Sequence, residues 1–274
     1  MFKIIIMALL IFIGMVGYDS ITDKAQPTTP VQQEQQKISK HEKSAAMALF
    51  TSLLPPKEEW PSPVHKFYLA FNMDEVIDPI RQNPNWTSLD AMSRDIPQAL
   101  IAIEDHAFYN HGAIAVEGIL RAALANINAG EVVQGGSTLT QQFVKNVFLS
   151  HEQSMERKIE EAVLSLMLED NYSKDEILEL YLNTTYFGAG STGIKQASRT
   201  YFGKAPSALT LAEAAVIASL PYAPTGLNPL ENPEGCKKRQ LLVLAAMHKY
   251  GMINQGQLAE AKAEKIRLTN GTVM

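Results

Sequence analysis

The most restrictive feature of this 274-residue chain is a succession of helical segments beyond Asp90. Apolar residues recur there at helical spacing, and glycine, proline or small polar residues separate the segments. The segments with this pattern are 96–103, 115–127, 157–168, 177–182, 214–220 and 233–250. Because no convincing run of alternating apolar and polar residues appears, and no internal repeat does, we predict a mainly α fold.

Start and stop signals support these segments. Ser173 with Glu176, and Thr210 with Glu213, have the spacing of a capping box, in which two side chains satisfy free backbone N–H groups at a helix start. Gly251 closes the last segment, as glycine often does at a helix end. These signals predict helix boundaries as well as helix content.

The first 60 residues differ from the rest. Lys3 precedes an uncharged run, Ile4 to Tyr18, that is shorter than the roughly 20 residues of a typical membrane span. We favour residues 1–18 as an uncleaved single-pass membrane anchor with Lys3 inside the cell, and a cleaved signal peptide is the alternative. Residues 19–60 form a polar tether and an unassigned lead-in. We assign 61–252 to one domain and 253–274 to a helical tail.

Composition excludes several classes of function. A hydrophobic content of 46% suits a packed core, whereas a net charge of -5 and a pI near 5.7 provide no basic face for nucleic acid. Cys236 is the only cysteine, so this chain has neither an internal disulfide nor a cysteine-rich metal site.

Four polar clusters interrupt the helical segments. The first, EDHAFYNH at 104–111, combines carboxylates, histidines and aromatic residues. Asp105, His106 and His111 are metal-ligand types, but their spacing matches no strong zinc signature such as H-E-x-x-H. An acid/base centre and the polar end of an ordinary helix are the other interpretations.

The second cluster, GGSTLTQQFVKN at 135–146, has two glycines, hydroxyl groups, amides and one lysine. Exposed donors that end in a cation suit a phosphate, while a glycine hinge with a Ser/Thr helix cap is the structural alternative. The third cluster is RKIEE at 157–161, where Arg157 and Lys158 share a helical face with Glu161. The fourth, from Tyr181 to Lys204, is rich in aromatics and glycines. For the third and fourth clusters the structural alternatives are a solvated ion-pair face and packing around a glycine turn.

Taken in order, these clusters resemble the motifs of the peptidoglycan glycosyltransferases of family 51, found in class A penicillin-binding proteins and monofunctional transglycosylases. The matching stretches are IAIEDHAFYNHGA, QGGSTLTQQFVKN, ERKIEEAVLSLMLE, KDEILELYLNTTYFGAGSTGIKQASRTYFGK and LTLAEAAVIASLPYAPTGLNP. The resemblance implies a lysozyme-like, two-lobed, mainly α-helical domain at the outer (periplasmic) face of the bacterial cytoplasmic membrane. It implies polymerisation of lipid II, with the growing glycan chain as donor, inversion to a β-1,4 linkage and release of undecaprenyl diphosphate.

By this resemblance the site residues take separate roles. Glu104 is the base that removes the proton of the acceptor hydroxyl, and Glu161 is the second glutamate, which orients the diphosphate or holds a divalent cation such as Mg²⁺ or Mn²⁺. The residues expected to bind substrate or diphosphate are Ser137, Thr138, Gln141, Gln142, Lys145, Asn146, Arg157, Lys158 and Asn183. Asp105, Phe108 and His111 are expected to support the site, with His106 incidental.

The chain departs from the family pattern at three points. Ala115 and Gln153 stand where an acidic residue and an arginine are common, and Gln153 weakens the diphosphate assignments. Neither S-x-x-K nor K-T-G occurs, so we expect no transpeptidase activity. The apolar stretch 113–127 is either a core-facing helix or, as the resemblance implies, in contact with the membrane.

Two alternatives remain open. The first is a lytic enzyme of the same fold, although a hydrolase has no diphosphate to bind. The second is a non-catalytic module that binds lipid II or cell-wall proteins. Other cell-wall synthesis proteins are the expected partners.

Overall fold

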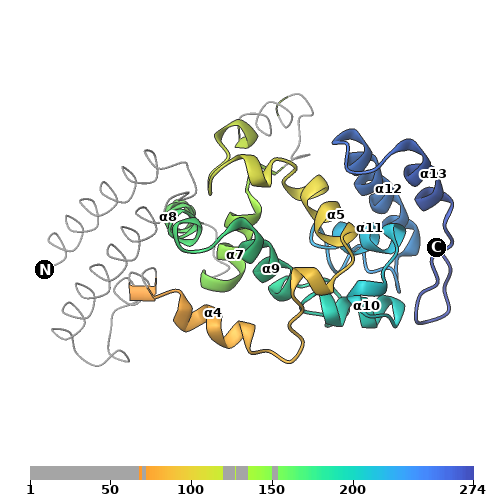
Figure 1. The fold of residues 1–274 in the computed structure, drawn as a ribbon, viewed down its shortest axis with the longest axis horizontal. Coiled ribbons are helices and arrows are strands. Elements are labelled where there is room, and N and C mark those ends of the chain that lie inside the picture. Colours follow the sequence, from red (N-terminus) through yellow and green to blue (C-terminus); the bar gives the residue numbers. More distant parts are fainter. Residues whose placement is uncertain (1–67, 70–71, 120–126, 128–134, 150–153) are drawn as a thin grey trace, which may run out of the picture. The chain divides into compact units, whose positions relative to one another are not determined.

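The computed structural model describes residues 68–69, 72–119, 127, 135–149 and 154–274, and it divides the chain into compact units 1–77 and 78–274. The helices are α4 (Asp74–Arg81), α5 (Asp95–Glu104), α7 (Leu139–Phe148), α8 (Met155–Asn171), α9 (Lys174–Thr184), α10 (Ile194–Phe202), α11 (Leu211–Ser219), α12 (Pro233–Lys249) and α13 (Gln255–Ala263) (Figure 1). Short 3-10 turns lie at Leu89–Ala91, Phe108–Asn110 and Pro206–Ala208. Among the described residues, strand-like pairing is limited to isolated bridges. This confirms the prediction of a mainly α fold.

The predicted capping boxes are present. Ser173 accepts a hydrogen bond from the backbone N–H of Glu176 at the start of α9, and Thr210 does the same for Glu213 at the start of α11. The α12 helix begins at Pro233, the first residue of the predicted segment 233–250, and the Asn232 side chain caps it. Local chemistry therefore determines where these helices begin.

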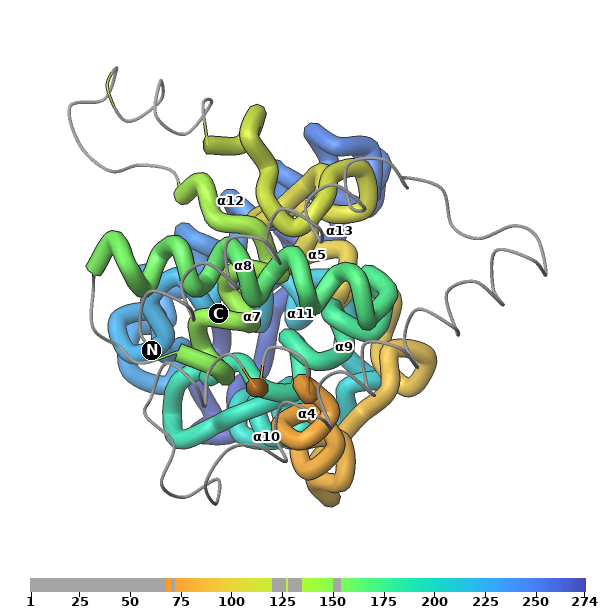
Figure 2. Tube along the Cα trace, turned by 90° about the vertical axis from the view of Figure 1, so that its left-hand side faces the viewer, coloured from red at the N-terminus to blue at the C-terminus, as the bar shows by residue number. Residues whose placement is uncertain are grey.

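The helices of the second unit form two contacting groups. In the first, α5, α11 and α12 pack on one another, and α13 packs on α11 and α12; in the second, α7 packs on α8 and α9 (Figures 1 and 2). The α10 helix contacts α9 of one group and α11 of the other. Residues Ala212–Ser219 of α11 are all buried, because this helix is apolar on nearly every side and lies inside its group.

The last residues of the chain are helical only in part. Within 253–274 the α13 helix ends at Ala263, and residues 264–274 turn back on themselves through an antiparallel bridge between Arg267 and Val273. Gly271, with φ of 86°, permits this turn, and the backbone N–H of Thr269 bonds to the carbonyl of Tyr201 at 3.0 Å. A sequence that lacks helical spacing after Ala263 explains why the predicted helical tail is shorter.

Several predictions fall outside the described residues. The anchor at 1–18, the tether at 19–60, position Gln153 and most of 115–127 lie there, while Val116–Ile119 is described as helical, with Val116 and Ile119 exposed. In the described part of the chain, none of the helices has the length and apolar character needed to cross a membrane. The boundaries at 61 and 252 stay predictions.

Candidate active site

Glu104 is the last residue of α5, so its side chain leaves the helix where the following loop begins. Its Oε2 accepts a hydrogen bond from Gln142 Nε2 of α7 at 3.0 Å. The apolar run 96–103 that precedes Glu104 anchors α5 in the core, with Ile96, Ala99 and Leu100 almost completely buried. A carboxylate is thus held by a rigid element beside a polar partner from the other helix group.

The environment of Glu104 raises the pKa of its carboxyl group. Burial raises its pKa above the usual glutamate value, since a charged carboxylate is poorly solvated there. The hydrogen bond from Gln142 and the positive charges of Arg239 and Lys145 act in the opposite direction, while Asp105 adds to the rise. These opposing effects are typical of a general base.

A buried tyrosine orients the amide of Gln142. The Tyr181 hydroxyl donates to Gln142 Oε1 at 3.0 Å, which directs the NH₂ end of the amide to Glu104. Burial raises the pKa of Tyr181, so this hydroxyl keeps its proton and acts as a donor. Tyr181, Gln142 and Glu104 form one hydrogen-bonded chain from α9 through α7 to α5.

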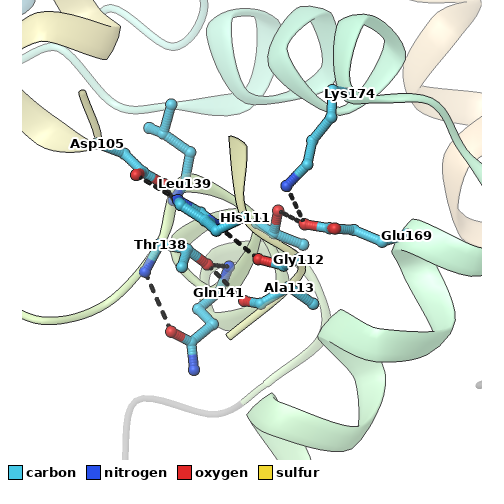
Figure 3. A network of polar contacts seen from close by, with 10 residues as sticks. Asp105, His111, Gly112, Ala113, Thr138, Leu139, Gln141, Glu169 and Lys174 are labelled. Atoms are coloured by element: carbon cyan, nitrogen blue, oxygen red, sulfur yellow. Dashed lines mark hydrogen bonds and ion pairs between the residues drawn. The ribbon is translucent and has the colours of Figure 1, made fainter. Parts of the chain in front are cut away.

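Asp105 and His111 brace the loop that directly follows α5 (Figure 3). Asp105 Oδ1 lies 2.6 Å from His111 Nε2, and Asp105 Oδ2 accepts a bond from the backbone N–H of Leu139, the first residue of α7. His111 Nδ1 lies 2.6 Å from the carbonyl oxygen of Gly112. The bond to Asp105 raises the pKa of His111 above its usual value. These contacts agree with a supporting role for both residues.

Phe108 also contributes to this loop. Its ring is fully buried and packs edge to face on His111. Lys174 Nζ lies 4.5 Å from the centroid of the Phe108 ring. Lys174 and Thr140 both contact Glu169 Oε1, at 2.7 and 2.5 Å, which ties α7 to α8 and α9 (Figure 3). The aromatic part of EDHAFYNH therefore shapes the loop.

Thr138 and Gln141 build the start of α7. The Thr138 hydroxyl accepts from the Gln141 N–H, and Gln141 Oε1 accepts from the Thr138 N–H, in a capping box (Figure 3). Thr138 also donates to the carbonyl of Ala113 at 2.8 Å, and both capping side chains are 2% exposed. The helix-cap interpretation of this cluster applies to these two residues, and their contact with substrate stays a prediction.

A cation cluster lies at the start of α8. Glu161 is only 1% exposed, and its carboxylate pairs with Lys158 Nζ and, at 3.4 Å, with Arg157 Nη1. Lys158 Nζ also contacts Ser137 Oγ at 3.2 Å. The spacing in RKIEE correctly predicted a shared face, but the carboxylate is buried, so this is not a solvated ion-pair face. Two cations against one carboxylate leave a net positive charge for an anion.

The remaining predicted residues divide into two kinds. Lys145 and Asn146 are exposed on α7, three and four residues after Gln142, so they share its helical face. Asn183 makes three hydrogen bonds, to both backbone groups of Thr87 and to the carbonyl of Glu179. The structure thus gives Asn183 a fold-maintaining role, and its contact with substrate stays a prediction.

The family model described as Transglycosylase matches residues 73–248, which include Glu104, α7, the cation cluster and most of α12. The chain belongs to the transglycosylase family.

Relatives of this transglycosylase support the assignment. The "Putative transglycosylase H16_A0665" of Cupriavidus necator is 41% identical over 71% of this chain and 84% of its own length. Penicillin-binding protein 1A of Neisseria flavescens is 44% identical over 68% of this chain and 23% of its own. Penicillin-binding protein 2D of Bacillus subtilis is 45% identical over 66% of this chain and 26% of its own length. The chain spans about a quarter of the length of these two penicillin-binding proteins, and the family resemblance is confirmed.

Two contacts near Glu104 involve residues that the sequence did not single out. The Arg239 guanidinium of α12 lies 4.1 Å from the ring centroid of Tyr222, and its charge acts on Glu104. His106, which was expected to be incidental, stacks on Tyr250 at the end of α12 with ring centroids 4.2 Å apart. Arg239 stands in the run KKRQ, which resembles an ordinary charged helix surface, so no sequence signal singled it out.

Proposed function

We propose that this chain polymerises lipid II into β-1,4-linked glycan strands, with inversion at the anomeric carbon and release of undecaprenyl diphosphate. Glu104 removes the proton of the acceptor sugar hydroxyl while that oxygen forms a bond to the anomeric carbon of the donor. The bond from the anomeric carbon to the diphosphate oxygen breaks at the same time, and its electron pair leaves with the diphosphate. No covalent glycosyl-enzyme is needed.

The surroundings of Glu104 support the role of base. A sugar hydroxyl is a weak nucleophile, and a base works best when its pKa lies near the working pH. Burial moves the pKa of Glu104 upward, toward that range, while the bond from Gln142 holds the carboxylate in one orientation.

The cation cluster supports a diphosphate leaving group. Negative charge grows on the leaving oxygen as the glycosidic bond breaks, so fixed cations lower the energy of the transition state. Arg157 and Lys158 supply that charge, Glu161 holds both side chains in place, and Ser137 adds a hydroxyl contact to Lys158. Lys145, exposed on α7, is a further cation near the base.

One observation carries the proposal: the segment from Ser137 through α7 contacts both Glu104 and the cation cluster at the start of α8. Ser137 bonds to Lys158 of the cation cluster, and Gln142, five residues later, bonds to Glu104. A base and an anion site on one short rigid segment match a reaction whose nucleophile and leaving group lie on opposite sides of one carbon. The two groups of helices, joined at Glu104 and Gln142, support the two-lobed, lysozyme-like architecture.

A divalent cation is part of the proposal, with Glu161 as its candidate ligand. Both oxygens of Glu161 contact cations of the chain, and the described residues contain no group of three acidic, histidine or cysteine side chains that would form a metal site. The described side chains alone therefore do not provide the ligands for a bound Mg²⁺ or Mn²⁺. Such an ion would take most of its ligands from the diphosphate, as Mg²⁺ commonly does.

Location and partners follow from the substrate. Lipid II lies in the cytoplasmic membrane, so we propose that residues 1–18 anchor the chain there, with the catalytic domain on the outer face and other cell-wall synthesis proteins nearby. We also propose that this chain lacks transpeptidase activity, since S-x-x-K and K-T-G are absent from its sequence. Labelling with a fluorescent penicillin tests the second proposal, because a transpeptidase serine would be acylated.

The decisive test of function is a polymerisation assay. Purified chain with lipid II in detergent and Mg²⁺ is expected to produce long glycan strands that a muramidase digests. Release of soluble muropeptides from finished peptidoglycan, without strand synthesis, would identify a lytic enzyme instead. Binding of lipid II without turnover would identify a non-catalytic module.

A further inference from the structure

Residues 84–89, which we call the strap, are bound to helix α9 by a carboxylate that the proposed reaction has not so far used. Glu179 of α9 contacts the strap with both of its oxygens. Its Oε1 accepts a hydrogen bond from Trp86 Nε1 at 3.1 Å, and its Oε2 accepts one from the backbone N–H of Leu89 at 2.8 Å. One side chain of α9 therefore holds two points of a segment that lies 90 to 93 residues earlier in the chain.

Asn183 holds the middle of the strap from the same face of α9. Its Oδ1 accepts from the backbone N–H of Thr87 at 2.9 Å, and its Nδ2 donates to the carbonyl of Thr87 at 2.8 Å. Thr87 is buried, so both of its backbone groups need partners within the protein, and Asn183 supplies them. Glu179 and Asn183 are four residues apart, a spacing that places them on one face of the helix. Two bonds from each side chain therefore join this face to the strap.

Tyr181 lies between these two residues in the sequence but on the other side of the helix. Each residue of an α-helix is turned by about 100° from the one before it, so Tyr181 points roughly opposite to Glu179 and Asn183. Its side chain is 1% exposed and donates to Gln142 of α7, which in turn bonds to Glu104. The α9 helix thus carries the strap on one face and the hydrogen-bonded chain to the proposed base on the opposite face.

From this geometry we propose that Glu179 is a positioning residue for the reaction: by fixing α9 against the strap, it sets the direction in which Tyr181 presents its hydroxyl to Gln142. The inference deepens the proposed function and rests on it, because Gln142 holds Glu104, the proposed base. A small rotation is enough to matter. Turning α9 by about 10° about its axis would displace a side-chain end by about 1 Å, and a hydrogen bond of 3.0 Å does not survive such a displacement.

The test measures kcat and KM for lipid II polymerisation at a temperature where all variants are folded. Glu179 is the residue to change, because Asn183 is itself a predicted substrate contact. Glu179→Gln keeps the shape of the side chain but replaces one acceptor oxygen with an NH₂ group, so one of the two bonds to the strap is lost. We expect kcat to fall about two- to tenfold with KM unchanged, the effect of one weakened hydrogen bond. Trp86→Phe removes the donor on the strap side and should give a loss of the same kind.

Two comparisons separate positioning from a loss of stability. Lys195 of α10 donates to the carbonyl of Pro84 at 2.9 Å, so Lys195→Met removes a bond to the same strap but leaves the bonds to α9 in place, and kcat should not change. In the Tyr181→Phe background the hydroxyl to be positioned is absent, so Glu179→Gln should cause no further loss of kcat. An equal further loss in that background would contradict the inference, because Glu179 would then act independently of Tyr181.

The side-chain amide of Gln142 provides a readout that needs no turnover. Its NMR signal in ¹⁵N-labelled protein, assigned with Gln142→Leu, depends on the two hydrogen bonds that the amide makes. Glu179→Gln and Trp86→Phe should both move this signal, whereas Lys195→Met should leave it in place. A signal that stays in place in both of the first two variants would overturn the inference and leave Glu179 with a fold-maintaining role. An inactive wild-type chain would refute the proposed function, and the NMR comparison would still decide whether Glu179 positions this amide.

Discussion

Glu104 and Gln142 are joined by a hydrogen bond of 3.0 Å between the last residue of α5 and the middle of α7. This bond links two groups of helices that otherwise hold the proposed base and the proposed anion site on separate elements. It orients the carboxylate and favours its ionised form. Substitutions at either end of the bond should therefore change chemistry before they change the fold.

Gln142→Leu should move the acid limb of kcat/KM to higher pH. The bond from Gln142 lowers the pKa of Glu104, so its loss leaves burial less opposed and the pKa rises. A hydrogen bond to a charged group is worth about 1.5–3 kcal/mol, which corresponds to a shift of roughly one to two pH units. The measurement is the pH profile of lipid II polymerisation.

Tyr181→Phe is the matched variant for Gln142→Leu. It removes the hydroxyl that orients the Gln142 amide but keeps the bond from Gln142 to Glu104, so the shift should be smaller and in the same direction. An acid limb that stays in place in both variants, with only KM raised, would show that Gln142 contacts substrate instead of tuning the base.

His111 should make stability depend on pH. Its folded-state pKa is raised above 6.5, mainly by Asp105, so its contribution is fully present below about pH 6.5 and is lost as the pH rises through the folded value. Urea unfolding should therefore show a difference in free energy between wild type and His111→Gln that is larger at pH 6 than at pH 9. A difference that grows toward pH 9 would contradict the assigned ion pair.

Two capping boxes allow a matched test of α7. Thr138→Ala and Thr210→Ala each remove an N-cap side chain that also bonds to a second group, so each should lower the free energy of unfolding by about 1–2 kcal/mol. Only Thr138→Ala should also reduce polymerisation at a temperature where both variants are folded, because α7 carries Gln142. Equal losses of activity would reduce the effect to general stability.

Glu161→Gln should reduce polymerisation whether or not Mg²⁺ is present. The carboxylate holds Arg157 and Lys158, and without it both cations are free to leave the anion site. We expect a loss of at least about tenfold in kcat/KM, both in EDTA and in Mg²⁺, since removing a fixed transition-state contact typically costs tenfold or more. A loss confined to Mg²⁺-containing buffer would assign Glu161 to the metal.

Local chemistry explains what the sequence predicted well. The Ser173 and Thr210 boxes and the Asn232-Pro233 start depend on residues within one helical turn, so helix starts follow from the sequence directly. The shared face of Arg157, Lys158 and Glu161 is likewise a matter of helical spacing.

The spacing of residues along the sequence could not predict contacts between elements that are far apart in the chain. The cation of Arg239 and the stack of His106 on Tyr250 depend on how α12 packs on α5, which no local pattern encodes. Asn183 is a further case: the family resemblance implies a binding role, which stays a prediction, while no local pattern indicates its hydrogen bonds to Thr87, 96 residues away.

The most direct measurement of the central claim is lipid II polymerisation by Glu104→Gln. Glutamine keeps the shape of the side chain and a partner for Gln142 but cannot accept the hydroxyl proton, so the rate should fall by about 10²–10⁴ with the thermal unfolding curve unchanged. A folded Glu104→Gln variant that polymerises lipid II at the wild-type rate would contradict the assignment of Glu104 as the base.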